Sequence, residues 1–223
     1  MFHATVLPDS LHVRQAPGQK NDSIDFLNKG NRIQVVAVDG SGTWLQVQYG
    51  TNKSGWCSGK YLMPEHSAGD SPWLDFAPKE IGVREVPGNE AHERIRQYLA
   101  TVDDLSKTSK SSDETAWCSC FMNWLVEQAG GYGSNSAAAL SWRNWRKERP
   151  DVKKAKLGDI AVFTRRSADD QGGHVALFIS FNADKSQVLA LGGNQSNAVR
   201  YSWYPTNGVA RGTEYQLVSV RAN

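Results

Sequence analysis

The strongest constraint on the fold is a change of hydrophobic pattern near residue 64. Before it, short apolar–polar alternations of period two follow one another, such as "NRIQVVAV" and "TWLQVQY", with the turn "DGSG" between them. This spacing predicts short strands joined by hairpins. A polar stretch with Pro and Gly follows, and helical spacing begins after it. We therefore expect an all-β domain over 1–64, a linker over 65–72 and a second domain over 73–223.

The second domain begins with helical patterns and ends with strand patterns. "WLDFAPKEIG" predicts a short helix that ends at Gly82, "NEAHERIRQYLATV" a helix over 89–102, and "ALSWRNWRKE" a further helix. The residues between 103 and 114 form a polar, Ser-rich loop. Strands are predicted over 158–163, 174–180, 186–194 and 214–222. Helices followed by an antiparallel meander imply an α+β fold, with the helices packed on one face of the sheet.

Charge and cysteine content exclude several classes of function. The net charge is +2 and the basic residues are dispersed, so we expect no nucleic-acid partner. No apolar run reaches the roughly 18–20 residues of a membrane-spanning helix, so we expect no membrane insertion. The N-terminus shows no pattern of a signal peptide, so we expect synthesis in the cytoplasm and delivery by another route. Because the chain has only three cysteines, we expect no disulfide framework and at least one free thiol.

Two of the cysteines stand one residue apart in "TAWCSCFMNW". If Thr115 caps the helix, Cys118 lies in the first turn at the start of an apolar stripe, and Cys120 lies about 200° around the helix. The two thiols then point apart, so we expect neither a shared metal nor a redox pair, and no cofactor. The positive end of the helix would lower the pKa of Cys118 and favour a nucleophile. From the helix alone, a small core residue remains an equal alternative.

A cysteine nucleophile needs a base, and His174 is the histidine that opens a buried strand pattern. The other histidines fall in the barrel, the linker or a polar helix start: His3, His12, His66 and His92. A hairpin centred near Asp184 places His174 opposite Asn194, whose amide oxygen can accept the Nδ1–H of the imidazole. A slip of one residue would bring Gly193 or Gln195 to that place instead.

These motifs resemble two known families. "LHVRQAPG", "GNRIQVVAV", "WLQVQY" and "GWCSGKYL", over about 4–63, resemble the bacterial SH3-type (SH3b) domain. "ETAWCSCFMNWLVEQAG", "LGDIAVF", "GGHVALFIS" and "LGGNQSN", within about 72–221, resemble the NlpC/P60 and CHAP superfamily of papain-like cell-wall peptidases and amidases, nearest to a CHAP-like branch. The resemblance implies a papain-like antiparallel sheet preceded by a small all-β SH3b barrel.

The resemblance also implies roles for single residues. Cys118 would be the nucleophile, His174 the base and Asn194 the group that orients the base. Many CHAP domains carry an acidic residue at the position of Gly192, so Gln195 is a further candidate for orienting or oxyanion support. Candidates for the walls of the substrate groove are Trp117, Trp142, Trp145 and Trp203, with core packing as the alternative for each.

The implied function is hydrolysis of an amide in the stem peptide of peptidoglycan, with an endopeptidase favoured over an N-acetylmuramoyl-L-alanine amidase. Such a protein would act in the periplasm or cell wall, as a phage endolysin or as an antibacterial effector whose producer needs an immunity protein. The alternatives are a thiol acyltransferase or deamidase on the same fold and an inactive cell-wall-binding module.

Overall fold

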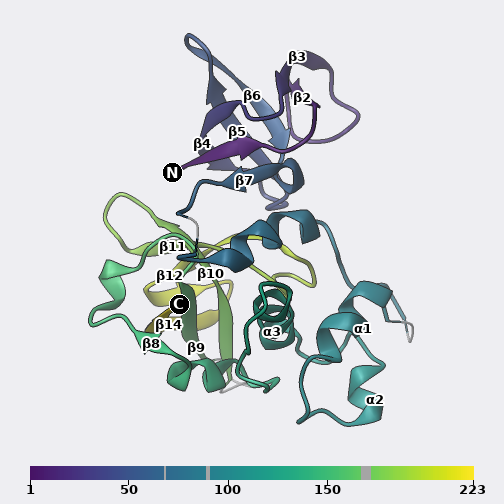
Figure 1. Cartoon of the computed structure of the whole chain (residues 1–223), viewed down its shortest axis with the longest axis vertical. Helices are drawn as coiled ribbons and strands as arrows, with labels where there is room; N and C mark the ends of the chain where they lie inside the picture. The colour runs from purple at the N-terminus through teal and green to yellow at the C-terminus, as the bar shows by residue number, and fades with distance from the viewer. Residues whose placement is uncertain (68, 89–90, 167–171) are drawn as a thin grey trace.

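The computed structural model describes residues 1–67, 69–88, 91–166 and 172–223. Figure 1 shows two β-rich parts, with the N-terminal part above the C-terminal part. The N-terminal sheet has the order β3-β2-β6-β5-β4-β1-β7. Its strands are β1 (Phe2–Val6), β2 (Ser10–Arg14), β3 (Ser23–Asn28), β4 (Arg32–Val38), β5 (Trp44–Tyr49), β6 (Lys53–Ser58) and β7 (Leu62–Pro64). The predicted all-β N-terminal part is confirmed.

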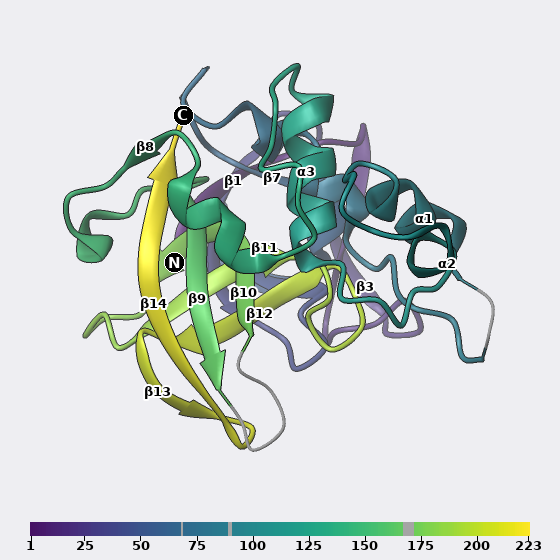
Figure 2. The ribbon, with the colours of Figure 1, turned by 90° about the horizontal axis from the view of Figure 1, so that it is seen from below.

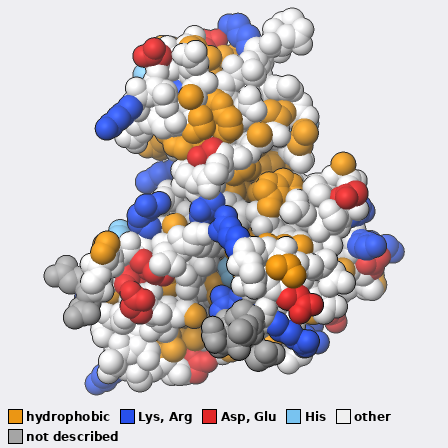
Figure 3. All heavy atoms as spheres, turned by 180° about the vertical axis from the view of Figure 1, so that it is seen from behind, with side chains coloured by type: hydrophobic (Ala, Val, Ile, Leu, Met, Phe, Trp, Pro, Cys, Tyr) orange, Lys and Arg blue, Asp and Glu red, His pale blue; other side chains and the backbone are white. Residues whose placement is uncertain are grey.

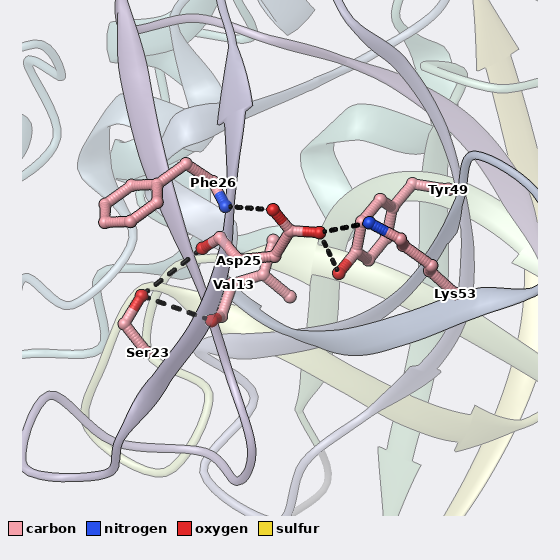
Figure 4. Close-up of polar contacts among 6 residues, drawn as sticks. All are labelled: Val13, Ser23, Asp25, Phe26, Tyr49 and Lys53. Carbon is pink, nitrogen blue, oxygen red and sulfur yellow. Dashed lines mark hydrogen bonds and ion pairs between the residues drawn. The ribbon is translucent and has the colours of Figure 1, made fainter.

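A polar cluster ties the edge strand β3 to the end of β5 and the start of β6. The Asp25 carboxylate accepts the Phe26 N–H at 2.8 Å, the Lys53 ammonium at 2.9 Å and the Tyr49 hydroxyl at 3.2 Å (Figure 4). The hydrogen bond from Lys53 lowers the pKa of Asp25, and burial raises the pKa of Tyr49 to about 12. Because β3 and β5 are not neighbours in the sheet order, this cluster helps the sheet to curl into a barrel.

The C-terminal part contains short helices and an antiparallel sheet with the order β12-β11-β10-β9-β14-β13, and β8 pairs with β14. The helices are α1 (Glu93–Leu99), α2 (Lys107–Lys110) and α3 (Cys118–Gln128). The strands are β8 (Lys147–Glu148), β9 (Ile160–Arg166), β10 (Gly173–Phe181), β11 (Gln187–Gly192), β12 (Arg200–Pro205), β13 (Asn207–Ala210) and β14 (Thr213–Ala222). The predicted α+β class is confirmed.

Alternation along the strands gives the second sheet two apolar faces. Val175 and Leu177 of β10 belong to the core that also contains Phe121 of α3. Ala176 and Phe178, which point the other way, belong to a separate apolar cluster. Figure 2 shows α3 beside the sheet, with α1 and α2 on the far side of α3. The helix that begins at Cys118 is therefore held against the face that bears Val175.

Several predicted elements have different limits in the structure. The stretches 73–82 and 139–148, predicted as α-helices, contain the 3₁₀ helices Pro72–Asp75, Ala77–Glu80 and Ala139–Asn144. Pro78 lies in the interior of the predicted helix 73–82, where it lacks the N–H that a continuous α-helix needs; it is instead accommodated in the first turn of the second 3₁₀ helix. The helix predicted over 89–102 is confirmed as the shorter α1; residues 89–90, and residue 68 of the predicted linker, lie outside the described residues. Strands β12 and β13 were not predicted.

The two parts pack against each other. Phe2 of β1 stacks on Tyr201 of β12 with ring centroids 6.0 Å apart, and the Tyr201 N–H donates to the Gly42 carbonyl at 2.9 Å. Buried apolar residues of both sheets form one continuous cluster. No helix in the described ranges is long and apolar enough to cross a membrane.

Candidate active site

Helix α3 begins at Cys118 itself. Trp117 occupies the N-cap position and offers no side-chain cap, so the predicted cap at Thr115 is wrong: the Thr115 hydroxyl donates to the Ser109 carbonyl at 2.9 Å instead. Trp117 is anchored by its indole N–H, which donates to the Glu85 carboxylate at 2.8 Å. With no side-chain cap, the first-turn N–H groups remain available near the Cys118 thiol.

The Cys118 thiol lies against strand β10. It is buried, and the N–H of Val175, the residue after His174, points to the sulfur. Burial raises the pKa of the thiol, whereas the N–H groups of Val175 and Ser119 and the charge of Arg165 act in the opposite direction. Burial outweighs these groups, so the helix end does not lower the pKa as the sequence suggested. The Cys118 thiol is therefore neutral in the folded chain.

His174 occupies the second residue of β10 and is also buried. Its ring packs on Tyr204 at a centroid distance of 4.9 Å and on Phe163 at 6.4 Å. Burial lowers the pKa of His174 to about 4, and Arg165 acts in the same direction, while the hydrogen bond with Gln195 opposes them. The imidazole is therefore neutral at pH 7 and has a lone pair to accept a proton.

Gln195, and not Asn194, contacts the imidazole. The Nε2 atom of His174 lies 3.1 Å from Gln195 Oε1. The Gln195 amide nitrogen donates to the carbonyls of Ala190 and Arg200, which fixes the amide with its oxygen toward the ring. Since this oxygen can only accept, His174 carries its proton on Nε2 and leaves Nδ1 as the basic atom. The expected contact through Nδ1 is thus replaced by one through Nε2.

The hairpin itself has the predicted register at this end. Leu177 pairs with Leu191, which continues to His174 opposite residue 194, and a bulge shifts the pairing only beyond Phe178. However, β11 ends at Gly192, and Asn194 has a φ of 53°. This left-handed residue turns the chain, so that Gln195 points inward and Asn194 lines the cavity beside His174.

Cys118 and His174 are both influenced by residues at the start of β10 and the end of β9. The thiol contacts the amide of the residue after His174, and the charge of Arg165 acts on both groups. Among the described hydrogen bonds, none joins the thiol directly to the ring. Catalytic hydrogen bonds are often long in a free enzyme and shorten when the substrate binds. The described residues contain no cluster of three or more His, Cys, Asp or Glu that could hold a metal ion.

Three of the four tryptophans predicted for the groove belong to the core. Trp117 and Trp142 are fully buried, and Trp145 is almost so. The indole of Trp142 also donates to the Ser119 hydroxyl at 2.8 Å inside the core. Trp203 is 40% exposed and borders the cavity at His174. The core alternative therefore applies to the first three, and Trp203 remains a groove candidate.

The remaining cysteines are buried and free. Burial raises the pKa of both Cys57 and Cys120 to about 12. Cys120 lies on the side of α3 that faces away from the sheet. It is nevertheless fully buried, because α1 packs against α3. Neither thiol has the setting of a reactive group.

Sequence reasoning missed the far wall of the cavity. This cavity of about 240 Å³ is bordered by His174, Tyr204, Arg165 and the tip of the β13–β14 hairpin with Arg211. Arg165 belongs to β9, the strand before the one that carries His174, and Arg211 to the turn between β13 and β14. No local pattern marks them, because only the sheet brings them to His174.

Two family models and one curated protein are similar to parts of the chain. The bacterial SH3 domain family matches residues 9–63, and the CHAP domain family matches residues 110–194. A curated relative from Bacillus subtilis, named "Putative N-acetylmuramoyl-L-alanine amidase YrvJ", is 24% identical over 146 residues, which cover 61% of this chain and 27% of that protein. The match thus spans about a quarter of the relative's length.

Solved structures show similarity over nearly the whole chain. NlpC2 from Trichomonas vaginalis is 14% identical with a TM-score of 0.41, and the match covers 99% of this chain and 71% of that chain. An NlpC/P60 family protein from Bacillus cereus is 13% identical with a TM-score of 0.37, over 99% of this chain and 63% of that chain. The family matches by themselves order the chain as a segment similar to the bacterial SH3 domain, residues 9–63, followed by a segment similar to the CHAP domain, residues 110–194.

Proposed function

We propose that the protein is a peptidoglycan hydrolase that cleaves an amide by a thiol mechanism. Cys118 is the nucleophile, His174 the general base and Gln195 the group that orients the base. The observation that carries the proposal is the placement of a helix-start thiol against β10, whose neutral histidine is held by Gln195. The CHAP match and the name of the Bacillus subtilis relative support the substrate class.

The chemistry follows from the protonation states. As the sulfur attacks the amide carbon, Nδ1 of His174 takes the thiol proton. The N–H of Cys118, at the start of α3, can donate to the oxyanion that forms. The imidazolium then returns its proton to the leaving nitrogen, the C–N bond breaks, and a thioester remains. Water attacks the thioester, with His174 as base again, and the carboxylic acid and the free thiol are released.

The bond that is cut is the finer part of the proposal. We place it in the stem peptide, as an endopeptidase would cut it. The name of the Bacillus subtilis relative favours the second candidate, the amide between the muramoyl sugar and L-alanine. Either substrate would place the action of the protein in the periplasm or cell wall.

Digestion of purified sacculi tests both points. The wild type releases muropeptides, and mass spectrometry of the new ends identifies the bond. An endopeptidase creates a new amino terminus and a new carboxyl terminus within the stem peptide. An amidase creates a sugar without its peptide. Cys118→Ala lowers the rate by at least roughly 10³-fold, because no other group can form the thioester. Cys120→Ala, which removes the second thiol of the same helix, keeps wild-type activity.

Two results would contradict the proposal. Sacculi unchanged by the wild type would favour an inactive wall-binding module or a thiol acyltransferase or deamidase acting on other substrates. Equal activity of Cys118→Ala and wild type would exclude Cys118 as nucleophile. If the protein is an antibacterial effector and not an endolysin, its producer also needs an immunity protein, and expression in the periplasm of a naive host would be toxic in a Cys118-dependent way.

A further inference from the structure

Tyr204 of β12 packs against the imidazole of His174. The two ring centroids are 4.9 Å apart with their planes tilted by 34°, and both residues line the cavity. His174 is 4% exposed. Figure 3 shows the pale blue of a histidine inside a hollow in the lower part of the molecule. Tyr204 therefore covers a part of the imidazole that the cavity would otherwise expose to water.

Gln195 alone does not fix the plane of the imidazole. It contacts the ring at Nε2, at a distance of 3.1 Å. A histidine ring rotates broadly about the bond between Cβ and Cγ, and Nε2 lies closer to the axis of this rotation than Nδ1 does. The hydrogen bond through Nε2 therefore selects one of the two flipped orientations of the ring but restricts the tilt of Nδ1 only weakly. A contact with the ring face restricts that tilt directly.

The ring of Tyr204 is itself held in place by other aromatic side chains. Its centroid lies 5.4 Å from that of Phe163 on β9 and 5.1 Å from that of Tyr215 on β14. The backbone of Tyr204 pairs with Val188 of β11. β12 also contacts β14, although three strands separate them in the sheet order, which shows that the sheet curls. Tyr204 is thus a firmly anchored support for the imidazole.

Burial dominates the protonation of both rings. It lowers the pKa of His174 and raises the pKa of Tyr204. The titratable and charged groups that act on the two rings come from several elements and are Cys118, Arg165, Arg200, Arg211 and Tyr215. The Tyr204 phenol is neutral at neutral pH, because its pKa lies above the ordinary value of a tyrosine. Its influence on the imidazole is therefore packing and the exclusion of water, not charge.

We propose that Tyr204 is a positioning residue for the general base: its ring holds the plane of the imidazole so that Nδ1 points to the Cys118 thiol, and it keeps water from the ring. The inference rests on the proposed function, because there Nδ1 takes the thiol proton. The aromatic ring supplies the contact, so phenylalanine can replace tyrosine. Catalysis depends on this contact because a displacement of about 1 Å can lower the rate by roughly 100-fold.

Tyr204→Leu tests the inference by removing the ring. We expect kcat on soluble muropeptides to fall by roughly 10- to 100-fold with little change in KM, because the base is misplaced while substrate binding is kept. Water then reaches the imidazole, so the pKa of His174 rises from about 4 toward 6.5 in an NMR titration. The acidic limb of the kcat/KM profile moves to higher pH with it, since the base accepts a proton only when neutral.

Tyr204→Phe, which keeps the ring, restores the wild-type kcat and the wild-type pKa of His174. Thermal unfolding of each variant is followed alongside. Tyr204→Met, which fills more of the space without an aromatic face, takes the place of Tyr204→Leu if the leucine variant does not fold. Phe181→Leu is the matched control: it removes a ring that packs on Phe178 in the same apolar cluster, with centroids 4.7 Å apart, and it leaves kcat and the pKa of His174 unchanged.

The outcomes separate this inference from the proposed function. An unchanged pKa of His174 in Tyr204→Leu overturns the inference and leaves the proposed function intact. A loss of kcat in Tyr204→Phe as large as in Tyr204→Leu does the same, because the hydroxyl and not the ring would then act. A wild type that cleaves no muropeptide overturns the proposed function and the catalytic role of Tyr204 with it, whereas the NMR titration still decides whether the ring shields His174.

Discussion

Burial and the contact with Gln195 shift the pKa of His174 in opposite directions. Desolvation favours the neutral ring, and the oxygen of Gln195 favours the protonated one. Desolvation is the larger effect. Because burial also raises the pKa of Cys118, both the thiol and the imidazole are neutral in the folded chain. In the proposed mechanism, the proton therefore passes from the thiol to the imidazole during the attack on the amide.

This balance predicts the pH dependence of stability. The pKa of His174 is about 4 in the folded chain and about 6.5 in an unfolded one, so between these values the unfolded chain binds more protons. The free energy of unfolding should fall as the pH drops from 6.5 to 4, by on the order of 3 kcal/mol from this residue. His174→Gln should lose that part of the slope. NMR titration of the His174 ring measures the pKa directly.

Gln195→Glu is the matched variant for the same titration. A carboxylate at that position favours the imidazolium, so the pKa of His174 should rise above its wild-type value. A wild-type ring that titrates near 6.5 would contradict the dominant effect of burial on His174. A pKa that stays unchanged in Gln195→Glu would contradict the contact between the two side chains.

The position of α3 depends on the end of β11. A Cβ on Gly193 would lie 2.5 Å from the Trp117 ring and 2.7 Å from the Phe121 Cβ. The strand end and the first turn of the helix can therefore approach only with glycine at this place. This contact links the two elements that carry Gln195 and Cys118.

Gly193→Ala should accordingly destabilise the domain by roughly 1–3 kcal/mol, because the helix start must move away from the strand. We also expect reduced activity, since the thiol would shift from β10. Gly40→Ala is the control, because a Cβ on Gly40 meets nothing within 4 Å. Chemical unfolding followed by tryptophan fluorescence measures both variants, and an equal effect of the two substitutions would refute the packing argument.

The loop between β4 and β5 of the N-terminal domain contacts β12 of the C-terminal domain. Arg200 donates to the Gly40 carbonyl at 2.7 Å, and the Tyr201 N–H donates to the Gly42 carbonyl. Both residues belong to β12, whose next residues, Ser202 to Tyr204, line the cavity at His174. The SH3 domain thus supports a wall of the candidate active site.

Gly42→Ala should weaken this junction. Gly42 has a φ of 70°, and a Cβ there would lie 2.1 Å from the Tyr201 carbonyl oxygen. Gly30→Ala is a matched control with a φ of 81° and open space around the Cβ. Gly42→Ala should lower Tm by roughly 2–4 °C more than Gly30→Ala, which corresponds to about 1 kcal/mol for a chain of this size. Calorimetry of both variants checks this, and equal shifts would mean that the junction adds no stability.

The local hydrophobic pattern of the sequence was enough to predict the fold class and the register of one hairpin. The change from period-two to helical spacing defined the α+β class, and the hairpin centred near Asp184 had the register that brings His174 toward residue 194. Residue spacing within one element is a local property, so it can be inferred without the rest of the chain. The choice of Cys118 and His174 as candidates also came from their places on a helix and a strand, and it stays a prediction.

Only the tertiary structure decided which neighbour contacts the imidazole and which side chains line the cavity beside it. The left-handed turn at Asn194 brings Gln195 to the ring, and burial turns Trp117 and Trp142 from groove candidates into core residues. Arg165 and Arg211 reach the same cavity from separate parts of the sheet. Burial and contact arise when distant segments pack together, and the same packing removes water from Cys118 and His174 and so sets their protonation.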